Sequence, residues 1–191
     1  MNSAGDLALR EALVRYFKET YVRGLNTLMG GNASIRIGGV VYITPSSVPK
    51  TELRPEDVVE LSVDGSVARG FRAPSSEWRM HIAIYKATKY TAVIHAHPPH
   101  ILALYTAGLT LNDSPLSELK SYISRIGEVP YLKPGSAELA EAVASEVAKG
   151  SDLVVLRNHG AVAVGQTLPE ALNKLEVAED VAKVILLSRC Y

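Results

Sequence analysis

The chain has 191 residues, a length that allows one domain with a sizeable hydrophobic core and requires no second domain. Its 20 basic and 20 acidic residues balance, which excludes a general electrostatic attraction to nucleic acid or to an anionic membrane. Any anionic ligand must therefore be held by local groups. The only cysteine, Cys190, excludes an internal disulfide framework.

We expect no targeting signal. Charged residues occur throughout residues 1–20, which no secretory signal tolerates, and no apolar stretch reaches the roughly 20 residues that cross a bilayer. Together with the single cysteine, these features predict a soluble, cytoplasmic protein.

Hydrophobic periodicity and turn residues predict helices and strands that alternate along the chain. Gly38 and Gly39 predict a tight turn between two strands, and Asp64-Gly65 predicts a second one. The expected elements are, in order, a helix at 6–23, strands at 32–37, 40–43, 58–63 and 66–69, a helix at 77–87, a strand at 91–97, a helix at 99–107, a helix at 136–149, strands at 153–156 and 161–164, and a helix at 167–188.

Capping residues support three of these helices. Ser75 or Ser76 can cap the helix at 77–87, Ser136 can cap the helix at 136–149, and a threonine with a glutamate three residues later forms a capping box before the last helix. Residues 109–135 have three prolines and weak periodicity, so we expect loops and short strands there.

Tight turns between several strand pairs favour an antiparallel arrangement over a doubly wound parallel sheet. We expect a three-layer α/β fold, with a central mixed or largely antiparallel sheet between layers of helices. Residues 1–191 are expected to form a single domain.

Two imidazoles stand one residue apart where a predicted strand ends. His95 and His97 follow an apolar run, and alternate residues of a strand point to the same face, so both rings can bind one ion. His159 follows the apolar strand at 153–156 and would complete a set of three. Three neutral imidazoles hold Zn²⁺ and leave a fourth position for water or substrate, as in catalytic zinc sites.

Other interpretations of the histidines stay open at this stage. Each ring could be a packed core residue with its hydrogen bonds satisfied. His81, inside a predicted helix, and His100, three residues after His97, could replace one of the ligands, or could be packed or solvated.

Three further segments offer hydroxyl groups or accessible backbone N–H groups that suit an anion such as phosphate. Each could equally be an ordinary helix cap or turn. They are Ser75-Ser76-Glu77, Gly30-Gly31-Asn32-Ala33-Ser34 and Thr44-Pro45-Ser46-Ser47.

The order of these motifs resembles that of the class II aldolase and adducin family, over nearly the whole chain. The combination of Ser-Ser-Glu, His-x-His and a later Asn-His-Gly is specific. The matching segments are Gly31-Asn32-Ala33-Ser34, Ile43-Thr44-Pro45-Ser46-Ser47, Pro74-Ser75-Ser76-Glu77-Trp78-Arg79-Met80-His81, His95-Ala96-His97 and Asn158-His159-Gly160.

The resemblance implies one Zn²⁺ per subunit, bound by His95, His97 and His159. It makes Glu77 the catalytic acid and base, which also touches the metal when substrate is absent. The residues that it assigns to substrate binding are Asn32, Ser46, Ser47, Ser75 and Ser76. Ser47 departs from the family pattern, which often has glycine there.

Two tyrosines are matched less specifically by the resemblance. The family's aldolases use tyrosines to move the proton of the departing aldehyde, and Tyr122 and Tyr191 occupy the regions where these are expected. Both could be ordinary surface residues.

The implied reaction is the reversible cleavage of a phosphorylated ketose, such as L-fuculose 1-phosphate, into dihydroxyacetone phosphate and an aldehyde such as lactaldehyde, through a metal-stabilised enediolate. Alternatives at the same site are epimerisation of a pentulose phosphate, dehydration of a thioribulose phosphate and decarboxylation. An epimerase would need further acid and base groups, for which Asp113 and Glu118 are the candidates. A non-catalytic adducin-like module is the remaining alternative. The resemblance also implies a homotetramer with sites near subunit boundaries.

Overall fold

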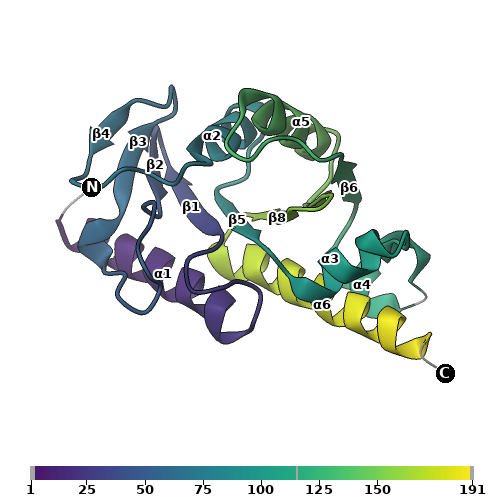
Figure 1. Cartoon of the computed structure of the whole chain (residues 1–191). Coiled ribbons are helices and arrows are strands. Elements are labelled where there is room, and N and C mark those ends of the chain that lie inside the picture. Colours follow the sequence, from purple (N-terminus) through teal and green to yellow (C-terminus); the bar gives the residue numbers. More distant parts are fainter. Residues whose placement is uncertain (1–2, 115, 190–191) are drawn as a thin grey trace.

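The computed structural model describes residues 3–114 and 116–189, and it contains an eight-stranded sheet between two layers of helices (Figure 1). The order of strands is β4-β3-β2-β1-β5-β8-β7-β6, and every neighbouring pair is antiparallel except β6 and β7. This mixed, largely antiparallel sheet confirms the predicted three-layer α/β fold. The strands are β1 (Asn32–Ile37), β2 (Val40–Ile43), β3 (Val59–Ser62), β4 (Val67–Arg69), β5 (Ala92–Ala96), β6 (Ile126–Val129), β7 (Leu153–Leu156) and β8 (Gly160–Gly165).

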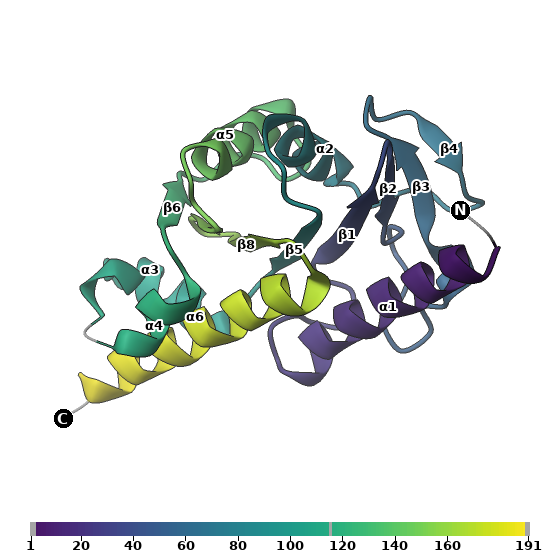
Figure 2. The same ribbon diagram turned by 180° about the vertical axis from the view of Figure 1, so that it is seen from behind.

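The helices divide between the two faces of the sheet, as Figures 1 and 2 show from opposite sides. Apolar side chains of α1, α3, α4 and α6 pack in one buried cluster, and those of α2 and α5 pack in the other. The helices are α1 (Ser3–Val22), α2 (Trp78–Ala87), α3 (Pro99–Thr106), α4 (Ser117–Tyr122), α5 (Ala137–Ala148) and α6 (Leu168–Ser188).

Alternation along β5 assigns its residues to the two clusters. Ala92 and Ile94 belong to the cluster of α1 and α6, whereas Val93 belongs to that of α2 and α5. His95 is two residues after Val93, so it faces the α2 side, and it lies directly opposite Asn32 in the pairing with β1. The sheet therefore brings His95 and Asn32 together beneath the start of α2.

Capping chemistry explains where two helices begin. The side chain of Ser136 accepts the Leu139 N–H at 3.1 Å, and the side chain of Thr167 accepts the Glu170 N–H at 3.3 Å. Glu170 in turn accepts the N–H of Gln166, one residue before the expected partner of a capping box.

The structure differs from the sequence-based expectations at three places. The N-cap of α2 is Glu77 rather than Ser75 or Ser76, and its side chain makes no cap bond. Helix α4 lies in the region where loops and strands were expected, because six residues are too few to show periodicity. Strand β5 ends at Ala96, because the N–H of His97 donates to the carbonyl oxygen of Leu25 instead of to a neighbouring strand. Among the described residues, no helix combines the length and apolar character that crossing a membrane requires.

Candidate metal centre and active site

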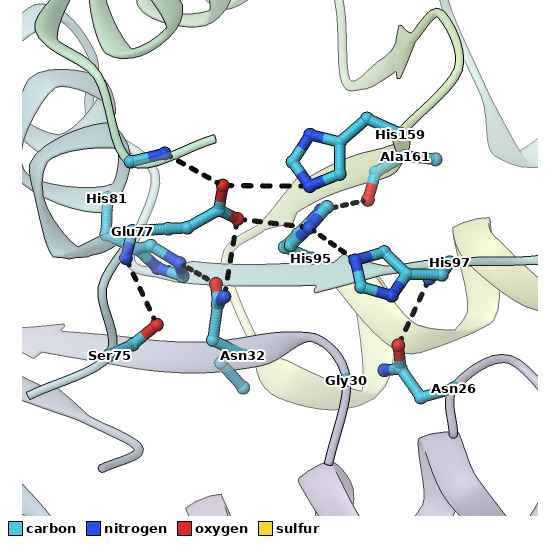
Figure 3. Close-up of polar contacts among 12 residues, drawn as sticks. Asn26, Gly30, Asn32, Ser75, Glu77, His81, His95, His97, His159 and Ala161 are labelled. Atoms are coloured by element: carbon cyan, nitrogen blue, oxygen red, sulfur yellow. Dashed lines mark hydrogen bonds and ion pairs between the residues drawn. The ribbon is translucent and has the colours of Figure 1, made fainter. Parts of the chain in front are cut away.

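Three imidazoles converge at the end of β5 (Figure 3). His95 is on β5, His97 follows it, and His159 lies in the turn between β7 and β8. One possible ligand atom from each ring lies within 4.8 Å of the others, and the Nε2 atoms of His95 and His97 are 3.1 Å apart. The sequence-predicted convergence of these rings is therefore present in the structure.

The protonation of His95 suits a metal ligand. Its Nδ1 lies 3.0 Å from the carbonyl oxygen of Ala161, which can only accept, so Nδ1 carries the proton and Nε2 presents a lone pair. Burial, together with the neighbouring His97 and His159, holds the pKa of His95 well below its usual range. Burial also lowers the pKa of His97. Both rings are neutral near pH 7, which is the state that binds a cation.

The distance between two of the rings fits a divalent cation. Nitrogens bound tetrahedrally to zinc at about 2.0–2.1 Å would be about 3.3–3.4 Å apart. This is close to the 3.1 Å between the Nε2 atoms of His95 and His97. The Nε2 atom of His159 faces Glu77 at the cluster, whereas its Nδ1 atom is buried and has no hydrogen-bond partner in the described part of the chain.

Glu77 lies beside the three rings and is 5% exposed. Its Oε2 is 3.1 Å from Nε2 of His95, and its Oε1 is 3.7 Å from Nε2 of His159. The backbone N–H of Gly135 donates to Oε1 at 3.3 Å, and the Asn32 amide lies 3.5 Å from Oε2. The carboxylate is therefore fixed at the edge of the imidazole cluster, where it can exchange a proton with a bound molecule.

A buried lysine holds the loop on the opposite side of the cluster. The ammonium group of Lys50 donates to the carbonyl oxygens of Thr27, Leu28 and Gly30, and burial lowers its pKa to about 8. A side chain at Gly30 would come within 2.9 Å of the His97 ring, so glycine is required by this close approach. Lys50 thus holds the loop that passes close to the His97 ring.

A pocket of about 250 Å³ opens beside the imidazoles. This volume is below the range of about 300–1,000 Å³ typical of sites for drug-sized ligands, and it suits a small metabolite. The hydroxyl-bearing and glycine segments predicted from the sequence meet here. The lining includes Gly30, Gly31, Asn32, Ser46, Ser47, Ser75, Ser76, Glu77, His95, His97, Pro134 and His159.

Ser47 has a left-handed backbone, with φ of 59°. Glycine adopts this conformation without steric cost, whereas in other residues the Cβ atom lies too close to the following carbonyl oxygen, which is unfavourable. The backbone explains why glycine suits this position and why serine is a costly departure from it. Ser47 is exposed at the rim of the pocket.

Other candidate residues lie away from these rings. Tyr122 is 52% exposed on α4 and is not among the described residues that line the pocket. His100 bonds to Glu179 instead of joining the cluster. Glu118 is exposed on α4. Tyr191 and the side chain of Asp113 lie outside what the structure describes, and the roles of both tyrosines stay predictions.

Sequence reasoning missed two contributors to this site. Gly135 supplies its N–H to Glu77 from a loop that follows β6, at a φ of +76° that suits glycine, and its local sequence does not mark it for this contact. His81 was considered as a ligand, but it lies behind Asn32 and binds that amide. Its spacing of four residues from Glu77 on α2 could have indicated a shared helix face.

Comparisons with known proteins agree with this geometry. The class II aldolase and adducin N-terminal domain family matches residues 11–186. L-fuculose phosphate aldolase of Methanocaldococcus jannaschii is 32% identical, over 94% of this chain and 96% of its own. The 5-deoxy-D-ribulose 1-phosphate aldolase of Bacillus thuringiensis is 36% identical, over 92% and 83%. A 3-oxo-tetronate 4-phosphate decarboxylase of Haemophilus influenzae is 31% identical, over 94% and 87%.

Solved structures show the same fold. An L-fuculose 1-phosphate aldolase superposes with a TM-score of 0.85 at 32% identity and covers 95% of this chain and 86% of its own. The enzyme of that name from Thermus thermophilus gives a TM-score of 0.84 at 29% identity, over 95% and 94%. The chain belongs to the class II aldolase and adducin family and is an enzyme of that family, a metal-dependent lyase.

Proposed function

We propose that the chain is an aldolase that reversibly cleaves a ketose 1-phosphate, such as L-fuculose 1-phosphate, into dihydroxyacetone phosphate and an aldehyde such as lactaldehyde. The observation that carries the proposal is the junction of three clustered imidazoles and Glu77 with a small pocket lined by hydroxyl groups. Among the relatives, the L-fuculose phosphate aldolase and the 5-deoxy-D-ribulose 1-phosphate aldolase support a ketose 1-phosphate as substrate.

His95, His97 and His159 would hold the metal, and zinc is the ion that three neutral imidazoles suit best. When bound, a divalent cation supplies Lewis-acid stabilisation of negative charge that develops on the substrate carbonyl oxygen. The three rings and Glu77 line the same pocket, so a substrate held there would approach the rings from the side of Glu77.

Glu77 moves the proton at the carbon next to the substrate carbonyl. Its oxygens are oriented by Gly135 on one side and by Asn32 on the other, so the carboxylate does not rotate freely. Orientation of a base toward its proton lowers the barrier, because the reacting atoms are held at hydrogen-bonding distance before reaction. Such a base contributes about 10²- to 10⁴-fold in rate.

The phosphate group would occupy the hydroxyl end of the pocket. Ser75 and Ser76 precede α2, where backbone N–H groups and the helix dipole favour an anion, and Ser46 and Ser47 line the same pocket from the turn after β2. Asn32 supplies a side-chain amide to the same pocket, beside Glu77. These donors fix the substrate so that its carbonyl end lies at the imidazoles.

Tyr122 and Tyr191 are proposed to serve the aldehyde half of the reaction. Tyr122 is exposed and does not line this subunit's pocket, so it would act on the site of a neighbouring subunit. This arrangement requires the homotetramer that the family resemblance implies, with sites near subunit boundaries. The protein is proposed to work in the cytoplasm.

The test is release of dihydroxyacetone phosphate from L-fuculose 1-phosphate by the purified protein, followed with a coupled dehydrogenase. A chelator is expected to stop the reaction and Zn²⁺ to restore it. The variant His97→Ala should lose activity and bound metal, whereas His100→Ala is the matched control because His100 binds Glu179 outside the cluster. Unchanged activity in His97→Ala would refute the metal site.

A panel of phosphorylated sugars separates the other reactions. Product analysis by NMR distinguishes cleavage of fuculose or 5-deoxyribulose 1-phosphate from epimerisation, dehydration and loss of carbon dioxide. The decarboxylase among the relatives makes a 3-oxo acid phosphate an essential member of the panel. Carbon dioxide release without aldehyde formation would replace the aldolase assignment with a decarboxylase.

A further inference from the structure

We propose that His81 is a positioning residue that, with Ser34 and Tyr85, fixes the side-chain amide of Asn32 so that its N–H groups face Glu77 and the pocket. The inference deepens the proposed function, on which its activity readout rests. A second readout, described below, does not depend on the reaction.

The four side chains form one continuous buried chain. Tyr85 Oη is 2.8 Å from Ser34 Oγ, which is 2.6 Å from His81 Nδ1. His81 Nε2 is 2.5 Å from Asn32 Oδ1, and the Asn32 amide nitrogen is 3.5 Å from Glu77 Oε2. His81 and Ser34 are 0% exposed, Tyr85 is 2% exposed and Asn32 is 4% exposed. Figure 3 shows the His81 ring pointing at Asn32.

Regular secondary structure produces this chain. Asn32 and Ser34 are two residues apart on β1 and share a face of the sheet. Glu77, His81 and Tyr85 follow one another at four-residue intervals at the start of α2 and along it, and so lie on one side of the helix. The strand and the helix therefore meet along two matched rows of polar side chains.

Donor and acceptor chemistry gives the chain one direction. An ionised Glu77 only accepts, so the Asn32 nitrogen faces it and the Asn32 oxygen faces His81. That oxygen accepts from Nε2–H of His81, which leaves Nδ1 to accept from the Ser34 hydroxyl. Ser34 has then used its proton and accepts from Tyr85, whose hydroxyl is nearer to Ser34, at 2.8 Å, than to the carbonyl oxygen of Thr91, at 3.4 Å. Each hydrogen bond fixes the next, from Tyr85 to Glu77.

The direction of these hydrogen bonds requires a neutral imidazole at His81. Burial lowers the pKa of His81 to about 3, so the ring has a single N–H at physiological pH. One N–H and one lone pair make the ring a donor on one side and an acceptor on the other. The second N–H of Asn32 has no partner among the described residues, and it is left for a ligand in the pocket that Asn32 lines.

Two matched variants separate positioning from packing. In His81→Gln, the amide nitrogen reaches the place of Nε2 and can donate to Asn32, but nothing accepts from Ser34. In His81→Asn, an oxygen takes the place of Nδ1 and can accept from Ser34, but nothing donates to Asn32. Both remove the ring and leave one neighbour without a partner. Asparagine also leaves the larger cavity, so a packing role predicts a lower melting temperature for His81→Asn but no dependence of its activity loss on Asn32.

The positioning role predicts unequal activity. We expect kcat/KM of His81→Asn to fall about 10- to 100-fold below that of His81→Gln, the loss typical of an unpaired buried polar group, at a temperature where both variants are fully folded. In an Asn32→Ala background, His81→Asn should cause no further loss, because His81 acts only through Asn32. Equal kcat/KM in the two His81 variants, or full additivity with Asn32→Ala, would overturn the proposal.

The tautomer of His81 is measured without any reaction. Nitrogen NMR of the ¹⁵N-histidine-labelled full chain should show a proton on Nε2 and none on Nδ1 between about pH 5 and pH 8. A proton on Nδ1 would reverse the chain and overturn the proposal. If the wild-type protein cleaves no sugar phosphate, the proposed reaction fails while this measurement still decides the role of His81.

Discussion

The buried His81 makes the metal-free protein sensitive to mild acid. Its pKa is about 3 in the folded chain because of burial, against about 6.5 for a histidine in an unfolded chain. The pKa is therefore lowered on folding, so its contribution to stability is complete above pH 6.5. As the pH falls from about 6.5 toward about 3, the unfolded state gains a proton that the folded state does not, and stability is lost.

The size of the effect follows from the shift. Each pH unit within this window costs about 1.4 kcal/mol for one such group, so lowering the pH from about 7 to about 5 removes about 2 kcal/mol of unfolding free energy. Glutamine does not titrate. In His81→Gln, the same change of pH should therefore cost about 2 kcal/mol less than in the wild type, whatever the variant's own stability.

Urea unfolding at the two pH values, with a chelator present in every sample, measures this double difference. The chelator is needed because protons also compete with a metal for His95 and His97. Both of these rings have lowered pKa values, but they contribute the same pH dependence to both proteins and cancel. An equal loss of stability in wild type and His81→Gln would show that His81 is protonated in the folded chain, and the reasoning would fail.

Three further predictions concern the site directly. Glu77→Gln should lower kcat about 10²- to 10⁴-fold while metal content, measured by elemental analysis, stays at the wild-type level. A drop in metal content would instead make Glu77 mainly a ligand. His159→Ala should bind Zn²⁺ at least about 10-fold more weakly in a competitive chelator titration, whereas His100→Ala should match wild type, and equal affinities would remove His159 from the site. Gly135→Ala places a Cβ 2.9 Å from the carbonyl oxygen of Ser76, at a φ of +76°. We expect this substitution to move the N–H of residue 135 away from Glu77 and to lower kcat about 10-fold with little change in KM. Unchanged kinetics would show that this hydrogen bond is dispensable.

Much of the fold follows from local sequence signals. The strands are apolar runs closed by turns, such as the turn at Gly38, whose φ is 57°. The helices after Ser136 and Thr167 begin at side-chain caps that the structure contains. Helix α4 could not be predicted, because a single buried residue, Leu119, supplies its contact with the core.

The candidate site is predictable only where its residues are close in sequence or share a strand face. The spacing of His95 and His97 predicts that their rings converge, although His97 lies beyond the end of β5. Gly135 could not be found this way, since it reaches Glu77 across 58 positions of sequence through a backbone group that every residue possesses. The contact between His81 on α2 and Asn32 on β1 could not be predicted either, because it depends on how the helix packs on the sheet.

The electrostatics of the pocket explain why costly backbone and side-chain arrangements gather around it. Among the described residues that line it, none is Lys or Arg, and the ammonium group of Lys50 is committed to loop carbonyls. Neutral donors hold an anion well only when they are already oriented, because each must replace a hydrogen bond to water without the help of a full charge. The left-handed backbone of Ser47 costs stability, and both it and the buried chain behind Asn32 fix donors at this pocket. The strained backbone of Ser47 and the buried chain behind Asn32 therefore lie at a pocket to which the described lysines and arginines contribute no side chain.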